Sequence, residues 1–143
     1  MMTRLNLDEL DEGYTVAGSP ILLLDGQPFT GVAYELNSQG ELWSEQGYRD
    51  GVLDGISRDW YSNGILKSET TYKWNRVHGH DQGWYENGKP AYKSVYELGT
   101  RLREQRWNEQ GQLVSDYHLD TASPKYVALV QTKALFQQQG LTP

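Results

Sequence analysis

Cysteine is absent from this sequence of 143 residues, and no purely aliphatic run is longer than the four residues of ILLL at positions 21–24. Without cysteine the chain cannot form disulfide bonds, thiolate metal sites or a cysteine nucleophile. The run at 21–24 is far shorter than the roughly 20 residues that a membrane-spanning helix requires. The first residues also lack the apolar segment of a secretory signal peptide. We therefore expect a soluble protein of the cytoplasm with no membrane partner.

Recognisable catalytic motifs are missing as well. The sequence has no glycine-rich phosphate loop, no nucleophile elbow and no His-Glu-x-x-His pattern. The sharpest candidate is HGHD at 78–81, because strand alternation would place His78 and His80 on one face, where two imidazoles with Asp81 nearby can chelate a metal. His118 alone remains to complete such a site. We expect no catalytic, cofactor-binding or metal-binding residues, and hence no enzyme.

Hydrophobic residues are scarce, at 37%, whereas aromatic residues reach 12%. A chain of this length is typical of one domain, and the aromatic content is too high for a disordered chain. The 15 glycines predict many tight turns. We therefore expect one open or elongated domain in which aromatic side chains supply most of the apolar burial.

The net charge of −6 is unevenly distributed along the chain. Residues 1–59 carry 11 acidic and three basic side chains, a net charge of −8, whereas residues 60–143 carry eight acidic and ten basic side chains, a net charge of +2. An acidic half repels nucleic acid and anionic lipid, and it attracts a basic surface. The alternative is a solvated acidic face that keeps the protein soluble.

Several residue types recur every 24 positions, which is typical of repeat arrays. The Asn-Gly pairs at 63–64 and 87–88 are strong hairpin signals. The segments between the turns mix β-branched, aromatic and charged residues, as half-exposed strands do. We therefore expect a mainly β fold, a single elongated antiparallel meander of stacked β-hairpins. The recurring columns are Gly31, Gly55 and Gly79; Gly40, Gly64 and Gly88; Tyr48, Tyr72 and Tyr96; and Leu36, Trp60 and Trp84.

The pairing within each hairpin has two solutions. A two-residue loop at 63–64 makes Tyr61 face Leu66, whereas a three-residue loop at 62–64 makes Trp60 face Leu66. A shift by one residue exchanges the two faces of a sheet. The sequence therefore leaves open which aromatic column is buried, although at least one column should be.

The two ends depart from the period, as the caps of repeat arrays do. Residues 1–18 are expected to form an acidic, loosely ordered arm, and residues 19–120 a sheet of about four repeats that begins with the strand SPILLLDG. Residues 121–143 are expected to hold a capping α-helix of the same domain, with Ser123 as its N-cap and Gly140 as its stop. The apolar stripe of this helix should cover an apolar patch or the edge of the last strand, or else bind a partner helix. The stripe consists of Tyr126, Leu129, Val130 and Ala134, flanked by Val127 and Leu135.

The segments YRDGVLDG, WYSNGILKSETTY and HGHDQGWYENGK, which begin at positions 48, 60 and 78, resemble the variant MORN repeat. The segment DGQPFTGVAYELNSQGELWSE, which begins at position 25, is similar to the opening of the YwqK-type antitoxin family. The resemblance covers roughly residues 23–119, and it implies a protein built of such repeats that acts as an immunity protein. The sequence departs from the pattern with Trp74-Asn75 in place of an Asp-Gly turn, Arg103 in place of a fourth glycine, and Pro90 in place of a leucine. Since proline removes a ladder hydrogen bond, we expect a bulge or an edge there.

Residues that break the period are free to determine which partner is bound, and aromatic side chains dominate binding hot spots. We therefore predict Tyr34, Trp43 and Trp74 as aromatic anchors for a partner. Alternatively, Trp43 packs under the N-terminal segment or the helix. The acidic side chains around the anchors complete the predicted partner-binding set: Glu35, Glu41, Glu45, Asp50, Asp54 and Asp59.

The leading hypothesis is an antitoxin or immunity protein that neutralises a cognate bacterial toxin by direct binding and occlusion of its active site. A toxin that acts on nucleic acid or nucleotides would present the basic surface that the acidic half attracts. The alternative is a non-enzymatic scaffold or adaptor module for protein–protein interaction, with membrane association as a weaker option. An uncovered edge strand would also allow a homodimer.

Overall fold

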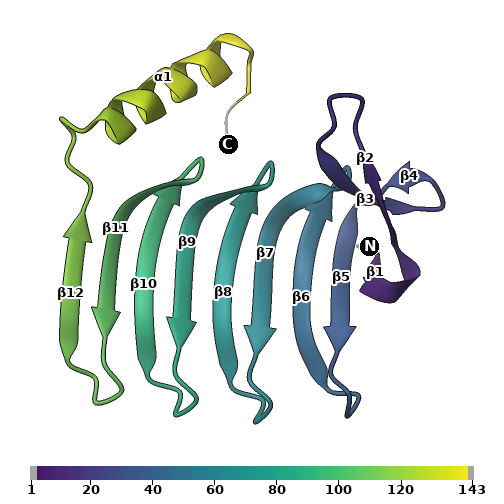
Figure 1. The fold of residues 1–143 in the computed structure, drawn as a ribbon, viewed down its shortest axis with the longest axis horizontal. Coiled ribbons are helices and arrows are strands. Elements are labelled where there is room, and N and C mark those ends of the chain that lie inside the picture. Colours follow the sequence, from purple (N-terminus) through teal and green to yellow (C-terminus); the bar gives the residue numbers. More distant parts are fainter. Residues whose placement is uncertain (1–2, 142–143) are drawn as a thin grey trace.

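The structure, a computed structural model, describes residues 3–141. Within them, one sheet of nine strands runs the length of the molecule in the order β1-β5-β6-β7-β8-β9-β10-β11-β12 (Figure 1). Strands β5 to β12 pair antiparallel with their neighbours, which confirms the expected meander of stacked hairpins, and β1 lies parallel to β5. The strands are β1 (Arg4–Asn6), β5 (Gly31–Leu36), β6 (Leu42–Arg49), β7 (Val52–Trp60), β8 (Leu66–Lys73), β9 (Arg76–Trp84), β10 (Pro90–Glu97), β11 (Thr100–Trp107) and β12 (Leu113–His118).

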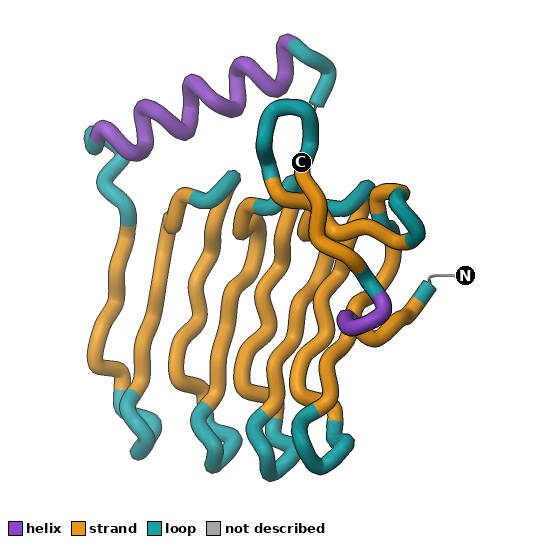
Figure 2. The backbone as a smooth tube through the Cα atoms, turned by 45° about the vertical axis from the view of Figure 1, so that its right-hand side comes forward, coloured by secondary structure: helices purple, strands orange, loops and turns teal. Residues whose placement is uncertain are grey.

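The N-terminal end of the sheet carries the hydrophobic core. A second sheet of three strands stands there (Figure 2), and residues 7–9 form a short 3-10 helix between its first strand and β1. The arm that we expected to be loosely ordered therefore forms regular structure, because its leucines pack into this core. The small sheet comprises β2 (Asp11–Tyr14), β3 (Pro20–Leu24) and β4 (Gln27–Pro28). The buried residues of the core are Leu10, Leu22, Phe29 and Ala33, with Leu5, Leu7, Leu24 and Tyr48 packed against them.

The hairpin loops at the lower edge of the sheet in Figure 1 contain three residues. In the loop at 62–64, the backbone N–H of Gly64 donates to the carbonyl of Tyr61 over 3.0 Å, and Gly64 has a φ of 84°. The register pairs Trp60 with Leu66. Of the two solutions left open by the sequence, the three-residue loop is the correct one, and glycine is needed because its last position is left-handed.

The turns at the upper edge contain two residues, both with positive φ. One of them is Trp74-Asn75, with φ values of 49° and 64°. A large aromatic residue is uncommon in this left-handed conformation, which Asn, Asp and Gly adopt more readily. A register shift between Pro90 and Tyr92 confirms the expected bulge at Pro90, and the other lower hairpins have the same shift at the equivalent place without a proline.

The WY-x-NG pattern, which occurs at residues 60–64 and 84–88, holds each hairpin to the next one. The hydroxyl of Tyr61 donates to the backbone carbonyl of Trp84 over 2.7 Å, and the side-chain amide of Asn63 donates to the carbonyl of Glu86 over 3.2 Å. The following repeat does the same, since the Tyr85 hydroxyl donates to the carbonyl of Trp107 over 2.7 Å. The repeated tyrosine and asparagine are therefore parts of the scaffold.

The fourth repeat is shifted by one residue against the first three. Arg103 pairs with Val95, and Val95 pairs with His80 on its other side. Arg103 thus takes the structural place of His80, not the place of Gly79. Our prediction that Arg103 replaces a fourth glycine is wrong, because it extended the 24-residue spacing into a repeat that begins one residue early.

Side chains of the large sheet project to two faces, which we name the tyrosine face and the ladder face. Beyond the N-terminal core, which includes Ala33 and contacts Tyr48, neither face is covered by a second layer, and both aromatic columns are half-buried. The expectation that one column is buried is wrong, and the one buried aromatic side chain among residues 3–141 is Phe29 in the N-terminal core. The tyrosine face carries Tyr48, Tyr72 and Tyr96, and the ladder face carries Glu45, Arg58 and Glu69 together with Trp60, Trp84 and Trp107.

Helix α1 (Pro124–Gln138) follows β12 and lies above the upper hairpin turns (Figure 1). The Ser123 side chain accepts a hydrogen bond from the backbone N–H of Tyr126 over 3.3 Å, which confirms the expected N-cap. The helix contacts the turns through buried Leu129, through Phe136 and through an ion pair between Lys133 and Glu97 (3.0 Å). Among the described residues, no helix is long and apolar enough to cross a membrane.

The helix covers the tips of the upper hairpins and leaves the outer edge of β12 open. We expected it to cover either an apolar patch or the edge of the last strand, and it covers the patch. Its buried stripe also differs from the expected one. Leu129 is 3% exposed, whereas Val130 is 48% exposed and Ala134 also lies on the outer side. The stripe that faces the sheet continues to Phe136 instead, because Trp74 supplies an aromatic surface there.

Candidate functional site

A chain of ion pairs and hydrogen bonds crosses the ladder face from β1 to β9. Arg4 donates to Glu45 over 2.6 Å. Arg58 donates to Glu45 over 3.2 Å and to Glu69 over 2.8 Å, and Gln82 donates to Glu69 over 3.3 Å. The register places Glu45, Arg58 and Glu69 directly opposite one another on three consecutive strands. Opposite charges across strands attract, so these carboxylates are neutralised within the sheet.

Three of the predicted partner-binding residues lie together on the ladder face. Tyr34 pairs with Glu45 across β5 and β6, and the Arg4 guanidinium stacks 4.9 Å from the centroid of the Tyr34 ring. Trp43 lies two residues before Glu45 on β6 and is 49% exposed. Neither the N-terminal segment nor the helix covers Trp43, which leaves it accessible to a partner.

The remaining acidic residues of the predicted set are dispersed. Glu35 and Asp59 lie on the tyrosine face, where both pair with Ser44 from opposite sides. Glu41 belongs to a lower hairpin loop, and Asp50 belongs to an upper turn. The structure therefore does not gather these four carboxylates into one patch.

Asp54 is held by two cations of the sheet. Its carboxylate lies 3.4 Å from the Lys73 ammonium and 3.9 Å from the Arg49 guanidinium. Asp54 is half-buried. Because its charge is already balanced, Asp54 contributes less to an acidic surface than its place in the sequence indicates.

Trp74 projects from a hairpin tip, as the sequence indicated, but it packs under the C-terminal helix. Its ring meets that of Phe136 edge-on, with the centroids 5.3 Å apart. Lys73 and Arg76 flank the two rings, at 5.4 Å from Trp74 and 6.0 Å from Phe136. Trp74 therefore docks α1 onto the sheet and is half-buried.

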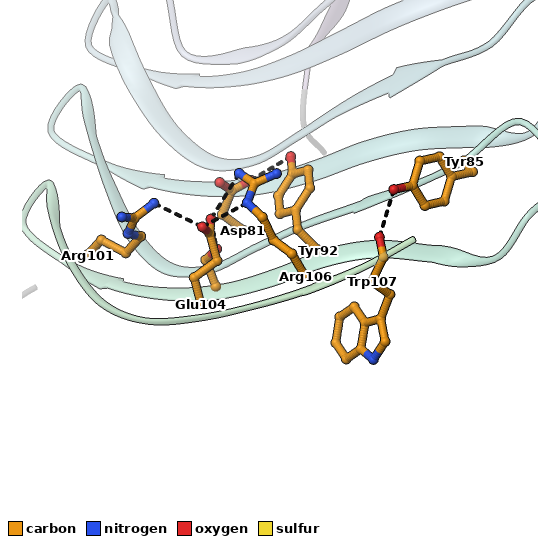
Figure 3. Close-up of polar contacts among 8 residues, drawn as sticks. Asp81, Tyr85, Tyr92, Arg101, Glu104, Arg106 and Trp107 are labelled. Atoms are coloured by element: carbon orange, nitrogen blue, oxygen red, sulfur yellow. Dashed lines mark hydrogen bonds and ion pairs between the residues drawn. The ribbon is translucent and has the colours of Figure 1, made fainter. Parts of the chain in front are cut away.

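The tyrosine face carries a second polar network at its C-terminal end (Figure 3). Glu104 is 7% exposed and accepts hydrogen bonds from Ser94 (2.9 Å), from Arg101 (3.0 Å) and from Arg106, whose Nε and Nη2 atoms lie at 2.9 and 3.2 Å. Burial alone would raise the pKa of Glu104, but the hydrogen bonds from Arg106 and Ser94 and the two guanidinium charges lower that pKa below its ordinary value. Glu104 is therefore held as a carboxylate.

Asp81 lies beside this network and shows the opposite behaviour. Burial raises the pKa of Asp81, although hydrogen bonds from Thr70 (2.9 Å) and Tyr92 (3.4 Å) act against the shift. Burial and the charge of Asp81 together raise the pKa of Tyr92 to about 12. Neither group lies in an enclosed cleft with a nucleophile, so the pair has the character of a structural contact.

Two features of these faces escaped the sequence reasoning. The first is the stripe of Trp60, Trp84 and Trp107 on the ladder face, of which we recognised Trp60 and Trp84 only as members of a recurring column. Figure 3 shows Trp107 on the opposite side of its strand from Glu104. The second is the Glu104 network, for which the concentration of arginines in RLREQR is the only sequence signal.

The histidine pair of HGHD is separated by its contacts. The Nδ1 atom of His78 accepts a hydrogen bond from the backbone N–H of Leu98 over 3.0 Å, which ties His78 to the adjacent upper turn. His80 instead lines a cavity on the ladder face that also contains His118. Among residues 3–141, no group of three or more His, Asp or Glu side chains is arranged to hold a metal ion.

The fold is a meander of 24-residue hairpins, and the tyrosine and asparagine of the WY-x-NG pattern join successive hairpins by hydrogen bonds. These features define a MORN-type repeat protein. The family model described as MORN repeat variant matches residues 53–73 and 78–97, which cover most of β7 to β10. The chain is 50% identical over 105 residues to the Immunity protein YwqK of Bacillus subtilis (strain 168), and the alignment covers 73% of this chain and 68% of that protein. The chain therefore belongs to the family of Immunity protein YwqK. No solved structure is significantly similar to it.

Proposed function

We propose that this protein is an immunity protein of the bacterial cytoplasm that neutralises a cognate toxin by binding it directly and covering its active site. The observation that carries the proposal is the 50% identity to Immunity protein YwqK over most of both chains. The architecture supports binding over catalysis, because a single-layer sheet offers two broad accessible faces. The perturbed carboxylates Asp81 and Glu104 are both engaged in contacts within the sheet.

The acidic N-terminal half is the end that docks on the toxin in this proposal. Although Glu45 and Asp54 are ion-paired, no ion pair within residues 3–141 involves Glu35, Asp50 or Asp59. These charges would steer association with a basic surface. A toxin that acts on nucleic acid or nucleotides carries such a surface.

Co-purification tests the proposal. The tagged protein is expressed in its native host together with its neighbouring genes, and the eluted proteins are identified by mass spectrometry. We expect one stoichiometric partner whose expression alone is toxic and whose toxicity this protein suppresses. If the neighbouring gene products neither bind nor become harmless in its presence, the proposal is wrong.

The docking end is tested with charge reversal once the partner is known. Asp50→Lys combined with Asp59→Lys should slow association at low salt more than it speeds dissociation, because long-range charges act mainly on the association rate. Glu86→Lys combined with Glu109→Lys is the matched control, since both residues lie exposed in lower hairpin loops of the C-terminal half and their replacement makes the same change of charge. An association rate that is equally slow in both variants would refute docking by the acidic end.

A scaffold or adaptor module is the second candidate, and the open edge of β12 favours it. Within the described residues, β12 pairs with β11 alone, and Leu113 and Val114 on it are 52% and 62% exposed. An uncovered strand of this kind pairs readily with another strand, which in this candidate joins two copies into a homodimer. Light scattering across a concentration series tests this pairing, and a strictly monomeric protein would exclude the homodimer.

A further inference from the structure

A cavity of about 310 Å³ opens on the ladder face at the C-terminal end of the sheet. One row of directly paired residues forms much of its lining, since His80, Val95, Arg103 and His118 face one another across β9, β10, β11 and β12. Lys93 and Asp116 line it from the adjacent row. The cavity thus combines four basic side chains and the amide of Gln105 with a single carboxylate.

The same row has no charge in the first half of the array. There it consists of Val32 paired with Gly47, and of Ile56 paired with Thr71. Ile56 occupies the place that His80 and Arg103 occupy in the following repeats. The change from aliphatic to basic residues is therefore a departure from the repeat, in positions that the scaffold fills elsewhere with valine and isoleucine.

The cations of this cavity lack the counter-charges that other cations on the same face possess. Arg4 and Arg58 each form an ion pair with Glu45. In contrast, no ion pair among residues 3–141 involves Lys93 or Arg103, and both side chains are exposed. Two permanent positive charges close together on a sheet repel each other.

Asp116 does not remove this imbalance. The Oδ1 atom of Asp116 lies 3.3 Å from the Nε2 atom of His118. The Asp116 carboxylate therefore contacts His118 and forms no ion pair with Lys93 or Arg103 among the described residues. With both histidines neutral, two cations face one carboxylate, which leaves an excess of one positive charge in the cavity.

We propose that this cavity binds a single oxyanion, either a phosphate or a carboxylate group. Arg103 and Lys93 supply the charge, an N–H group of His80 supplies a further hydrogen bond, and His118, whose Nε2 atom lies against Asp116, lines the site. Arginine presents its donors in a fixed fork that matches both groups. The site goes beyond the proposed immunity function, since it lies at the opposite end of the sheet from the acidic residues and does not depend on a toxin.

Histidine NMR tests the proposal directly, because the chain contains three histidines and only two of them line the cavity. The full-length protein is freed of metal ions on a chelating resin and is titrated with inorganic phosphate at constant pH and ionic strength, and then separately with acetate. We expect the imidazole signals of His80 and His118 to move together and to saturate. His78, which is bound to the adjacent turn, should not move and serves as an internal control.

The two titrations distinguish the chemical source of the oxyanion. A response to phosphate alone indicates a phosphate-bearing molecule, and a response to acetate indicates a carboxylate, such as the acidic side chain of a partner. The proposal is wrong if neither anion shifts His80 and His118 more than chloride at equal ionic strength does, or if His78 shifts equally. This outcome is independent of the co-purification result.

Matched variants localise the binding. Lys93→Gln combined with Arg103→Gln should weaken anion affinity at least tenfold, and since both side chains are exposed, the sheet should remain intact by circular dichroism. Arg49→Gln removes the same type of charge from an exposed side chain on β6, four strands from β10, and should change the affinity by less than twofold. Retention of wild-type affinity in the double variant would overturn the assignment.

Discussion

Replacement of Glu104 by glutamine perturbs the most buried charged group of the large sheet and leaves its shape unchanged. The carboxylate accepts four hydrogen bonds, three of them from the guanidinium groups of Arg101 and Arg106. Glutamine offers one oxygen, and its amide group would point N–H donors at a guanidinium that has only donors. A buried network that loses its acceptor is destabilised by more than the loss of one average hydrogen bond.

The magnitude follows from the exposure of the partners. Hydrogen bonds to charged groups contribute roughly 1.5–3 kcal/mol when they are buried, but the Arg101 and Arg106 side chains are 39% and 51% exposed, so water screens part of the interaction. We therefore expect Glu104→Gln to lower the free energy of unfolding by about 2 kcal/mol at pH 7. With an unfolding entropy of about 2.1 cal/mol/K per residue, this change lowers the Tm of the 143-residue chain by about 7 °C.

Urea denaturation monitored by circular dichroism measures the change, with Glu109→Gln as the control. Glu109 is exposed in a loop and engages only its backbone carbonyl, so its replacement should alter the stability by less than about 0.5 kcal/mol. The lowered pKa of Glu104 also fixes the pH dependence. The contribution of the Glu104 carboxylate to the free energy of unfolding is fully present above the unfolded-state pKa of about 4.3. It is lost as the pH falls through the lower pKa of the folded state. A stability difference below about 0.5 kcal/mol at pH 7, or one that does not shrink towards pH 3, would refute this account of the network.

Three further substitutions probe other parts of the fold. Asp81→Asn should leave the protein at least as stable as the wild type at pH 7, because the raised pKa of Asp81 shows that its ionised form is unfavourable in the folded state. Any gain in stability should disappear near pH 3, where Asp81 is protonated in both states, and urea denaturation at both pH values measures it. Tyr85→Phe should lower the free energy of unfolding by about 1 kcal/mol in the same assay, since the carbonyl of Trp107 loses its hydrogen-bond donor. An unchanged urea midpoint would contradict the role of Tyr85 in joining neighbouring hairpins. Phe136→Ala should weaken the docking of α1 on Trp74 by about 1–2 kcal/mol. Hydrogen exchange should then show lower protection of the amides of α1, while the protection of the central strands is unchanged.

The repeat architecture was predictable because the information is local and redundant. Each hairpin carries its own turn signal, and Gly64 and Gly88 recur where a left-handed residue is required. The N-cap at Ser123 was equally local. The bulge expected at Pro90 is present, but the other lower hairpins have the same register shift without a proline, so the repeat and not the missing N–H produces it.

The candidate site was harder to predict because its properties arise between repeats. The acidic character of Glu45 is cancelled by Arg4 and Arg58, which lie 41 and 13 residues away in sequence and meet it only through the register. Trp74 seemed free as a turn residue, yet its partner Phe136 lies 62 positions later, outside the repeats. The burial of a column could not be read from alternation, because alternation does not reveal that a sheet has no second layer.

The placement of the hydrophobic core at one end has a consequence for biosynthesis. Leu10, Leu22, Phe29 and Ala33 emerge from the ribosome before any complete 24-residue hairpin does. The N-terminal unit can therefore close while the rest of the chain is still being made, and strand β5 then presents a free edge as a template. Each later hairpin needs only the preceding one as its partner, so the sheet can grow at the pace and in the order of translation, and α1 is added last over the finished turns.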